Sequence, residues 1–150
     1  MTPASLPSIS EWLQAAGFDP TQINQRGSNG DTALMKAVQA GQLDIARSLM
    51  QAGADLNARN NDGNNALWFA CFRDRLDLID FLLEAEVDLN NQNDNGATAL
   101  MYAASAGKTA IVKVLLAAGA DPQVQNLDDF RAIDFAANRE ILGILKHGLC

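Results

Sequence analysis

Asn95-Gly96-Ala97-Thr98-Ala99-Leu100-Met101-Tyr102-Ala103-Ala104 decides the fold, because altered copies of this stretch recur at a fixed distance along the chain. The copy before it is Asp62–Cys71, the copy before that is Asn29–Val38, and a divergent copy, Asp128–Ala137, follows it. Positions 30, 63, 96 and 129 are therefore equivalent and evenly spaced. A constant period of roughly 20 to 50 residues is typical of stacked supersecondary units rather than of a single globular core.

A second stretch recurs between these copies. Leu49–Asn57 returns as Leu82–Asn90 and, less completely, as Leu115–Pro122. Each unit therefore holds two short segments with apolar residues at helical spacing, which in the first unit predict helices over about 32–40 and 43–51. Helices of this length are unstable alone, because nucleation costs more than a few hydrogen bonds return. We expect the pairs to be stabilised by stacking on one another.

The residues between the segments suit helix ends and tight turns. Thr32 and Thr98 stand where a side-chain hydroxyl can accept hydrogen bonds from the free N–H groups that begin a helix. Asn-Gly pairs at 29–30 and 95–96 favour tight turns, and they predict a hairpin-like finger loop between units. Glycines follow the helical segments, where a left-handed residue is favoured: Gly41, Gly53, Gly107 and Gly119.

Together these residues resemble the ankyrin repeat, whose unit reads roughly D-x-x-G-x-T-P-L-H-x-A-A-x-x-G-H-x-x-I-V-x-x-L-L-x-x-G-A-D-x-N and has the same period. The resemblance runs from about residue 8 to residue 149, and it implies an all-α fold: an ankyrin-repeat solenoid of helix-turn-helix units with hairpin-like finger loops and a capping repeat at each end. The family's proline is absent here, and its histidine is replaced, so we expect these units to rely more on packing. The matching residues of the third unit are Gly96, Thr98, Leu100, Ala103, Ala104, Gly107, Ile111, Val112, Leu115, Leu116, Gly119, Ala120 and Asp121.

The repeat period also predicts the domain organisation. We expect a loose N-terminal segment over residues 1–7 and a single ankyrin-repeat domain over 8–150. That domain comprises a cap at 8–26, repeats at 27–59, 60–92 and 93–125, and a C-terminal cap at 126–150. We call the three repeats unit one, unit two and unit three. Ser8 and Glu11 fit a capping box at the start of the first cap.

Two units depart from the regular pattern. In unit two, Asn65 replaces Thr, and Asp74 and Glu86 replace Gly. Glu tolerates a left-handed conformation poorly, so we expect Glu86 to be a strained or adjusted helix end. In the C-terminal cap, the second helix, 139–146, is expected to begin early relative to the period. A shortened last repeat is typical of a cap whose outer face meets water.

Composition narrows the classes of partner. The 150 residues carry a formal charge of −7, and an acidic surface disfavours nucleic acid and anionic membranes. We expect no secretory signal, and no apolar run in the sequence reaches the roughly 20 residues that a membrane span needs. Cys71 and Cys150 are too few for a disulfide framework, and Cys71 takes the place of a small core residue. We expect a cytoplasmic monomer with reduced cysteines.

The sequence predicts neither an enzyme nor a cofactor or metal site. His147 is the only histidine and lies near the end of the chain, so we expect no Ser-His or Cys-His arrangement, and two distant cysteines with one histidine serve zinc poorly. Residues 91–96 resemble the start of a calcium loop, but Tyr102 stands where the acidic twelfth ligand is required. We expect a polar repeat turn there.

The resemblance implies that the chain binds another protein through the concave face, the surface formed by the finger loops and the first helix of each unit. Phe72 stands out, because its counterparts in neighbouring units are Gln39 and Ser105 and the repeat needs no aromatic residue there. Aromatic residues beside an arginine are typical of interface hot spots. The predicted partner-binding residues are Arg59, Asp62, Asn64, Phe69, Phe72, Arg73, Asp94, Asn95, Tyr102 and Ser105.

Two questions stay open at this point. Phe69, Tyr102 and also Phe72 could instead pack as core between neighbouring helices, and we expect Trp68 to belong to the core. The first hypothesis of function is a non-catalytic protein-interaction module that acts as a small regulator or inhibitor. The alternative is a structural or self-associating scaffold unit.

Overall fold

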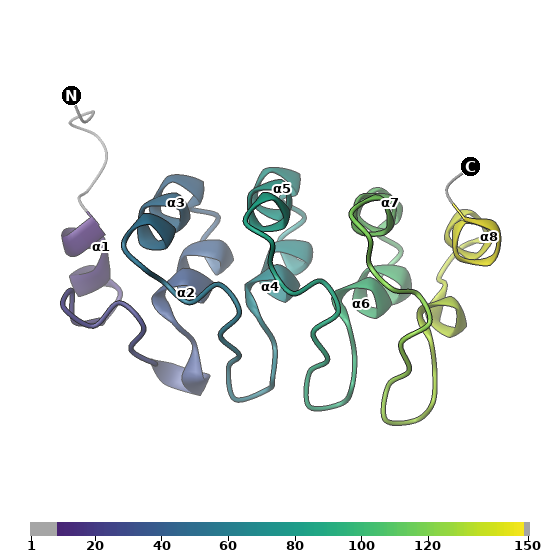
Figure 1. The fold of residues 1–150 in the computed structure, drawn as a ribbon, viewed down its shortest axis with the longest axis horizontal. Coiled ribbons are helices and arrows are strands. Elements are labelled where there is room, and N and C mark those ends of the chain that lie inside the picture. Colours follow the sequence, from purple (N-terminus) through teal and green to yellow (C-terminus); the bar gives the residue numbers. More distant parts are fainter. Residues whose placement is uncertain (1–8, 149–150) are drawn as a thin grey trace.

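The computed structural model describes residues 9–148, and within that range it contains α- and 3₁₀-helices but no β-strand. Figure 1 shows the helices as pairs that follow one another in a single row. The predicted all-α repeat solenoid is therefore confirmed. The first helices of units one to three are α2 (Ala33–Gln39), α4 (Ala66–Phe72) and α6 (Ala99–Ser105), and the second helices are α3 (Leu43–Gln51), α5 (Leu76–Glu84) and α7 (Thr109–Ala117).

Shortened units close the row at both ends. At the N-terminal end α1 (Ile9–Ala15) packs against α3. At the C-terminal end a 3₁₀-helix, η2 (Ala132–Phe135), replaces the first helix and is followed by α8 (Arg139–His147). The even spacing of α3, α5 and α7 would place the start of α8 at Leu142, so its early start at Arg139 is confirmed. The predicted capping box at Ser8 lies outside the described residues.

The first helices begin at the residues that the pattern indicates. The Thr32 and Thr98 hydroxyls accept hydrogen bonds from the third residue of α2 and α6, at 3.3 and 3.2 Å. Asn65 takes the same role in unit two, where its side-chain oxygen accepts from the Trp68 N–H at 3.4 Å. Asparagine thus replaces threonine without loss of the cap, because both offer an oxygen at the required position.

The helix ends of unit two are left-handed without glycine. Asp74 has a φ of 58° and Glu86 a φ of 68°, and their counterparts in units one and three are glycines with positive φ. The expectation of an adjusted helix end at Glu86 is confirmed. A side chain in this region costs free energy that glycine avoids, because its Cβ crowds the backbone.

One hydrophobic core runs the length of the row. The leucines that share a repeat position are fully buried between the stacked pairs: Leu34, Leu67 and Leu100 on the first helices, and Leu49, Leu82 and Leu115 on the second. Small residues lie beside them, and Cys71 is buried among them as predicted. Since each pair buries its apolar face against the next, the stacking itself stabilises the short helices.

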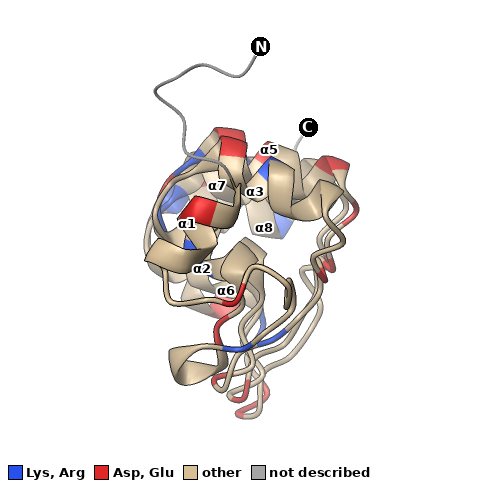
Figure 2. Ribbon diagram, turned by 90° about the vertical axis from the view of Figure 1, so that its left-hand side faces the viewer, with Lys and Arg blue, Asp and Glu red and all other residues tan. Residues whose placement is uncertain are grey.

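Hairpin-like fingers project from one edge of the helical row. In unit two the finger is closed by a hydrogen bond from the Asn60 N–H to the Asn64 carbonyl, at 3.0 Å. Neighbouring fingers are joined by one backbone bond each, such as the bond from the Asp94 N–H to the Asp62 carbonyl at 2.9 Å. Figure 2 shows the fingers below the helices, with acidic positions at their tips. Fingers and first helices together form the concave face.

Candidate partner-binding face

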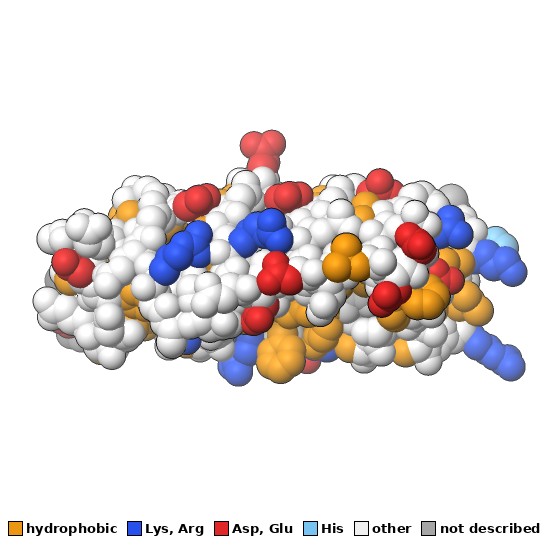
Figure 3. All heavy atoms as spheres, turned by 90° about the horizontal axis from the view of Figure 1, so that it is seen from below, with side chains coloured by type: hydrophobic (Ala, Val, Ile, Leu, Met, Phe, Trp, Pro, Cys, Tyr) orange, Lys and Arg blue, Asp and Glu red, His pale blue; other side chains and the backbone are white. Residues whose placement is uncertain are grey.

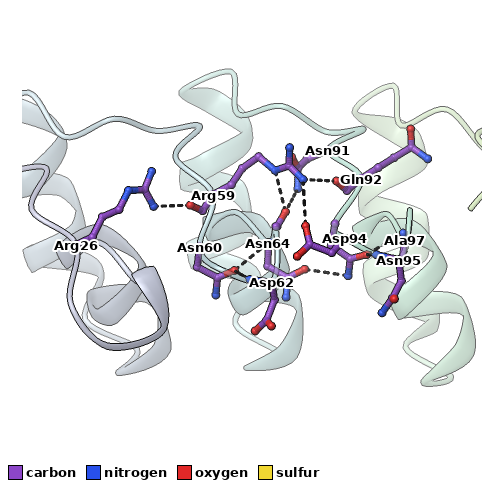
Figure 4. A network of polar contacts seen from close by, with 12 residues as sticks. Arg26, Arg59, Asn60, Asp62, Asn64, Asn91, Gln92, Asp94, Asn95 and Ala97 are labelled. Carbon is purple, nitrogen blue, oxygen red and sulfur yellow. Dashed lines mark hydrogen bonds and ion pairs between the residues drawn. The ribbon is translucent and has the colours of Figure 1, made fainter. Parts of the chain in front are cut away.

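A ladder of long polar side chains links the finger stems (Figure 4). The Arg59 guanidinium donates to the Gly63 carbonyl of its own finger at 3.1 Å and to the Gln92 carbonyl of the next at 2.8 Å. Arg26 binds the Arg59 carbonyl in the same way, and Gln92 binds the Gln125 carbonyl at 2.8 Å. Residues at the same repeat position therefore make the same contact, which fixes each finger against its neighbour.

A second ladder of asparagines holds the finger interiors. The side-chain oxygen of Asn60 accepts from the N–H groups of Asp62 and Asn64, at 3.0 and 3.1 Å. Asn93 repeats this arrangement, and its amide donates to the Asn64 side-chain oxygen at 3.1 Å. Asn64 is consequently only 8% exposed. This places Asn64, one of the predicted partner-binding residues, inside the finger framework and not on its exposed surface.

The finger tips expose carboxylates. Asp62, Asp94, Asp128 and Asp129 are all exposed. Among the described residues, only Asp94 of these four forms an ion pair, a long one of 4.0 Å with Arg59. The other three have no basic side chain within ion-pair distance in the described part of the chain. The finger wall of the concave face is therefore negatively charged.

The helical floor of the concave face carries an aromatic cluster. The rings of Trp68 and Tyr102 lie 5.0 Å apart between centroids, and those of Phe72 and Tyr102 lie 6.2 Å apart. Phe72 is 61% exposed, which is unusual for a side chain of this size and apolarity. Figure 3 shows hydrophobic side chains gathered along one edge of this face, from the middle of the row toward its C-terminal end.

Two hollows open on either side of this cluster. One, of about 330 Å³, is lined by Gln39, Trp68, Phe69, Phe72 and Arg73. The other, of about 120 Å³, is lined mainly by apolar and aromatic side chains. Its lining residues are Trp68, Ala97, Met101, Tyr102, Ser105 and Phe135. Because Trp68 borders both, the two hollows are adjacent, and we call them together the aromatic groove.

Lys108 contacts both the end of α4 and two aromatic rings of the groove. Its ammonium donates to the carbonyls of Cys71 and Phe72, at 2.9 and 3.1 Å, and pairs with the Asp74 carboxylate at 2.9 Å. It also lies 5.1 Å from the Tyr102 ring centroid and 5.7 Å from that of Phe72, at cation–π distance. Partial burial is the largest single influence and works against the charged form, but the interactions with Asp74 and Tyr102 together outweigh it and raise the pKa of Lys108. The amine is therefore a fixed cation at neutral pH.

The structure brings most of the predicted residues to this face. Phe69, Phe72 and Arg73 line one hollow, and Tyr102 and Ser105 line the other. Both Phe69 and Tyr102 are half-buried, so each packs on the core and still borders the groove. The remaining predicted residues lie on the fingers and are exposed, although the Arg59 guanidinium is occupied by the ladder: Arg59, Asp62, Asp94 and Asn95.

Sequence reasoning missed part of the groove. Trp68, which we expected in the core, is half-buried and borders both hollows, with the Tyr102 ring tilted against it. Phe135 was also missed, although its signal is present in the period. Its counterparts in the two preceding units are Tyr102 and Phe69, which are both groove residues.

Other chemistry finds little support in the described residues. Between residues 9 and 148 there is no group of three His, Cys, Asp or Glu side chains placed to hold a metal ion. Burial raises the pKa of Cys71 to about 12, so its thiol is a poor nucleophile. No helix in this range is long and apolar enough to cross a membrane.

Comparison with known proteins agrees with the repeat geometry. The family model for ankyrin repeats, which spans three copies of the unit, matches residues 5–93, 57–126 and 73–148. Together the matches extend over nearly the whole chain. A search of curated proteins finds no match.

Proposed function

Because the chain belongs to the ankyrin-repeat family, whose members are generally protein–protein interaction modules and typically non-catalytic, we propose that it binds one protein partner through its concave face. The aromatic groove is the observation that carries this proposal. We further propose that the chain acts in the cytoplasm as a small regulator or inhibitor, which occupies a surface of its partner without changing it covalently.

The physical properties of the groove support this role. Large aromatic side chains that are partly exposed in the free protein can bury more area when a partner covers them, and such residues dominate binding energies. The finger ladders and the buried asparagines hold the surrounding backbone in place. A preformed surface loses little conformational entropy on binding, so more of the contact energy appears as affinity.

The test is a pull-down with the full chain and its Phe72→Ala/Arg73→Ala variant. We expect a protein that is retained by the wild type and lost by this variant. The matched control is Leu142→Ala/Arg139→Ala, which removes another exposed apolar residue and another exposed arginine, here from α8. Retention of the same partner by the groove variant and its loss by the α8 variant would place binding on the C-terminal cap and refute the proposal.

A second candidate function is self-association into a scaffold. The observation that favours it is the last finger, where Leu127 is 73% exposed and Phe130 is 48% exposed. Sedimentation of the full chain over a range of concentrations separates the candidates. A monomer at all concentrations contradicts self-association, and a dimer that Leu127→Ser dissociates would support it.

A further inference from the structure

We infer, on the basis of the proposed function, that the partner presents a basic amphipathic helix to this chain. The helix lies along the concave face, with its apolar side in the aromatic groove and its lysines and arginines against the finger tips. The inference rests on the juxtaposition of two features, which are an apolar floor and a negatively charged wall that run side by side through unit two, unit three and the C-terminal cap.

The charges beside the groove favour a basic ligand. Asp62, Asp128 and Asp129 have no ion-pair partner among the described residues. The Asn29 amide donates to Asp62 at 2.9 Å but leaves its charge uncompensated, so all three carboxylates can pair with a partner's cations. Most of the cations near the floor are already occupied, since Lys36 pairs with Asp31 at 3.3 Å and Lys108 is held by Asp74. Electrostatic complementarity at such a rim steers encounter and selects partners by charge.

Arg73 is the exception among the groove residues. It lines the larger hollow and forms no ion pair with any described residue. It lies at the end of α4, at the side of the groove toward unit one. We therefore expect the ligand to carry a single acidic side chain at that end and basic residues along the rest.

The repeat spacing selects a helix as the ligand. Stacked helices lie about 8–10 Å apart, which sets the distance from one finger to the next. In an α-helix seven residues rise by about 10.5 Å and return to nearly the same face after two turns. Basic residues at positions i, i+7 and i+14 of a ligand helix would therefore each face one acidic finger. The apolar residues of the ligand would then occupy the adjacent side, over the groove.

Other occupants fit this surface less well. A second copy of the chain would bring the same acidic fingers against one another, and its net charge of −7 adds a general repulsion. Nucleic acid carries the same sign of charge as the finger wall, so its phosphates would be repelled. A basic segment of a protein partner is the occupant that satisfies the floor and the wall together.

The probe for the test is a displayed library of random peptides of about 20 residues, long enough for the i, i+7, i+14 pattern. The library is selected against the full chain, and the affinities of the selected peptides are then measured for designed variants. Asp62→Asn/Asp128→Asn/Asp129→Asn removes three charges from the finger tips. The first two changes introduce the residue that Asn29 and Asn95 already supply in the neighbouring fingers, and asparagine tolerates the left-handed φ of 67° at position 129.

Two further variants complete the design. Asp44→Asn/Asp80→Asn/Glu84→Gln removes the same three charges from exposed positions on α3 and α5, so both triple variants change the formal charge from −7 to −4. Phe72→Ser introduces the residue that unit three carries as Ser105, and it tests the groove apart from the charge.

We expect the selected peptides to be net positive, with Lys or Arg recurring at every seventh position. The finger variant should weaken binding on the order of tenfold at low salt, because it removes the carboxylates that face two of the three ligand cations, and the α3/α5 variant by less than about twofold. Raising NaCl from about 0.05 to about 0.5 M shortens the Debye length to about 4 Å and should remove most of that difference. Phe72→Ser should weaken binding by about thirtyfold or more, as expected for a hot-spot residue.

The alternative outcomes separate this inference from the proposed function. If the selected peptides are neutral or acidic and their binding depends on Phe72, the inference of a basic helix is wrong and the groove remains the binding site. Peptides that are unaffected by both the finger and the Phe72 variants would overturn both proposals. A selection that yields no peptide overturns the helical ligand, and the pull-down with the Phe72→Ala/Arg73→Ala variant then tests the proposed function independently.

Discussion

Replacing Glu86 with glycine should stabilise the protein. Glu86 ends α5 with a φ of 68°, in the left-handed region, and it is exposed. Its counterparts Gly53 and Gly119 occupy the same place in units one and three, with φ values of 98° and 102°. The left-handed conformation costs a non-glycine residue about 1–2 kcal/mol, because its Cβ approaches the following carbonyl oxygen.

The net gain is smaller than this strain. Glycine loses more conformational freedom on folding than alanine does, and this costs about 0.5–1 kcal/mol of stability. We therefore expect Glu86→Gly to raise the free energy of unfolding by about 0.5–1 kcal/mol. With a urea m-value of about 2 kcal/mol per molar, the unfolding midpoint should rise by about 0.25–0.5 M. Urea unfolding followed by circular dichroism measures this directly.

Two matched variants isolate the cause. Glu86→Ala removes the charge and keeps the Cβ, so its midpoint should stay close to that of the wild type. Gly119→Ala introduces the strain where an added Cβ would meet no atom within 4 Å, and it should destabilise by about 1 kcal/mol. Equal stabilisation by Glu86→Ala and Glu86→Gly would refute the argument from backbone strain and assign the effect to charge.

Three other changes test the framework. Lys108→Gln introduces the residue that unit one carries as Gln42, and it should lower the free energy of unfolding by about 1–3 kcal/mol. Two carbonyls at the end of α4 and the Asp74 carboxylate would lose their charged donor, and an unchanged urea midpoint would contradict this. Gly63→Ala should lower the free energy of unfolding by about 2 kcal/mol, since φ is 79° and the new Cβ would lie 2.6–2.9 Å from atoms of Asp94 in the next finger and of Arg59 in its own. A wild-type melting curve would show that the fingers adjust without cost. In a Cys150→Ser background, Cys71 should resist thiol reagents at about pH 8, because a pKa of about 12 leaves a thiolate fraction on the order of 10⁻⁴. Labelling of Cys71 should occur only as urea unfolds the protein, and rapid labelling of the native protein would contradict its burial.

The period of the sequence was sufficient to predict the framework. Helix positions, the buried leucines and the early start of α8 all follow from comparing residues at equivalent repeat positions, because identical neighbours impose identical packing. Asn65 could likewise be placed as a substitute for Thr98, since both supply an oxygen to the helix N-terminus. Periodic positions are predictable because each is determined by the adjacent copies of the unit.

The surface was harder to predict, because exposure at a given repeat position depends on the side chains of both neighbours. Asn64 occupies a variable position and is buried, since the amide of Asn93 reaches it from the next finger. Trp68 occupies a usually buried position and is partly exposed, with the Tyr102 ring tilted against it at 39°. Such pairwise contacts between units cannot be predicted from the period of the sequence.

The departures from the repeat in unit two are connected physically. Asp74 stands where units one and three have glycine, and it adopts a φ of 58° that glycine would adopt without strain. Its carboxylate holds the Lys108 ammonium at 2.9 Å, and that ammonium lies against the rings of Phe72 and Tyr102. A glycine at position 74 would relax the backbone and leave the lysine without its anion. The strained helix end and the exposed aromatic cluster therefore belong to one arrangement. The left-handed conformation of Asp74 costs local stability, and in return its carboxylate fixes the position of Lys108 beside the groove.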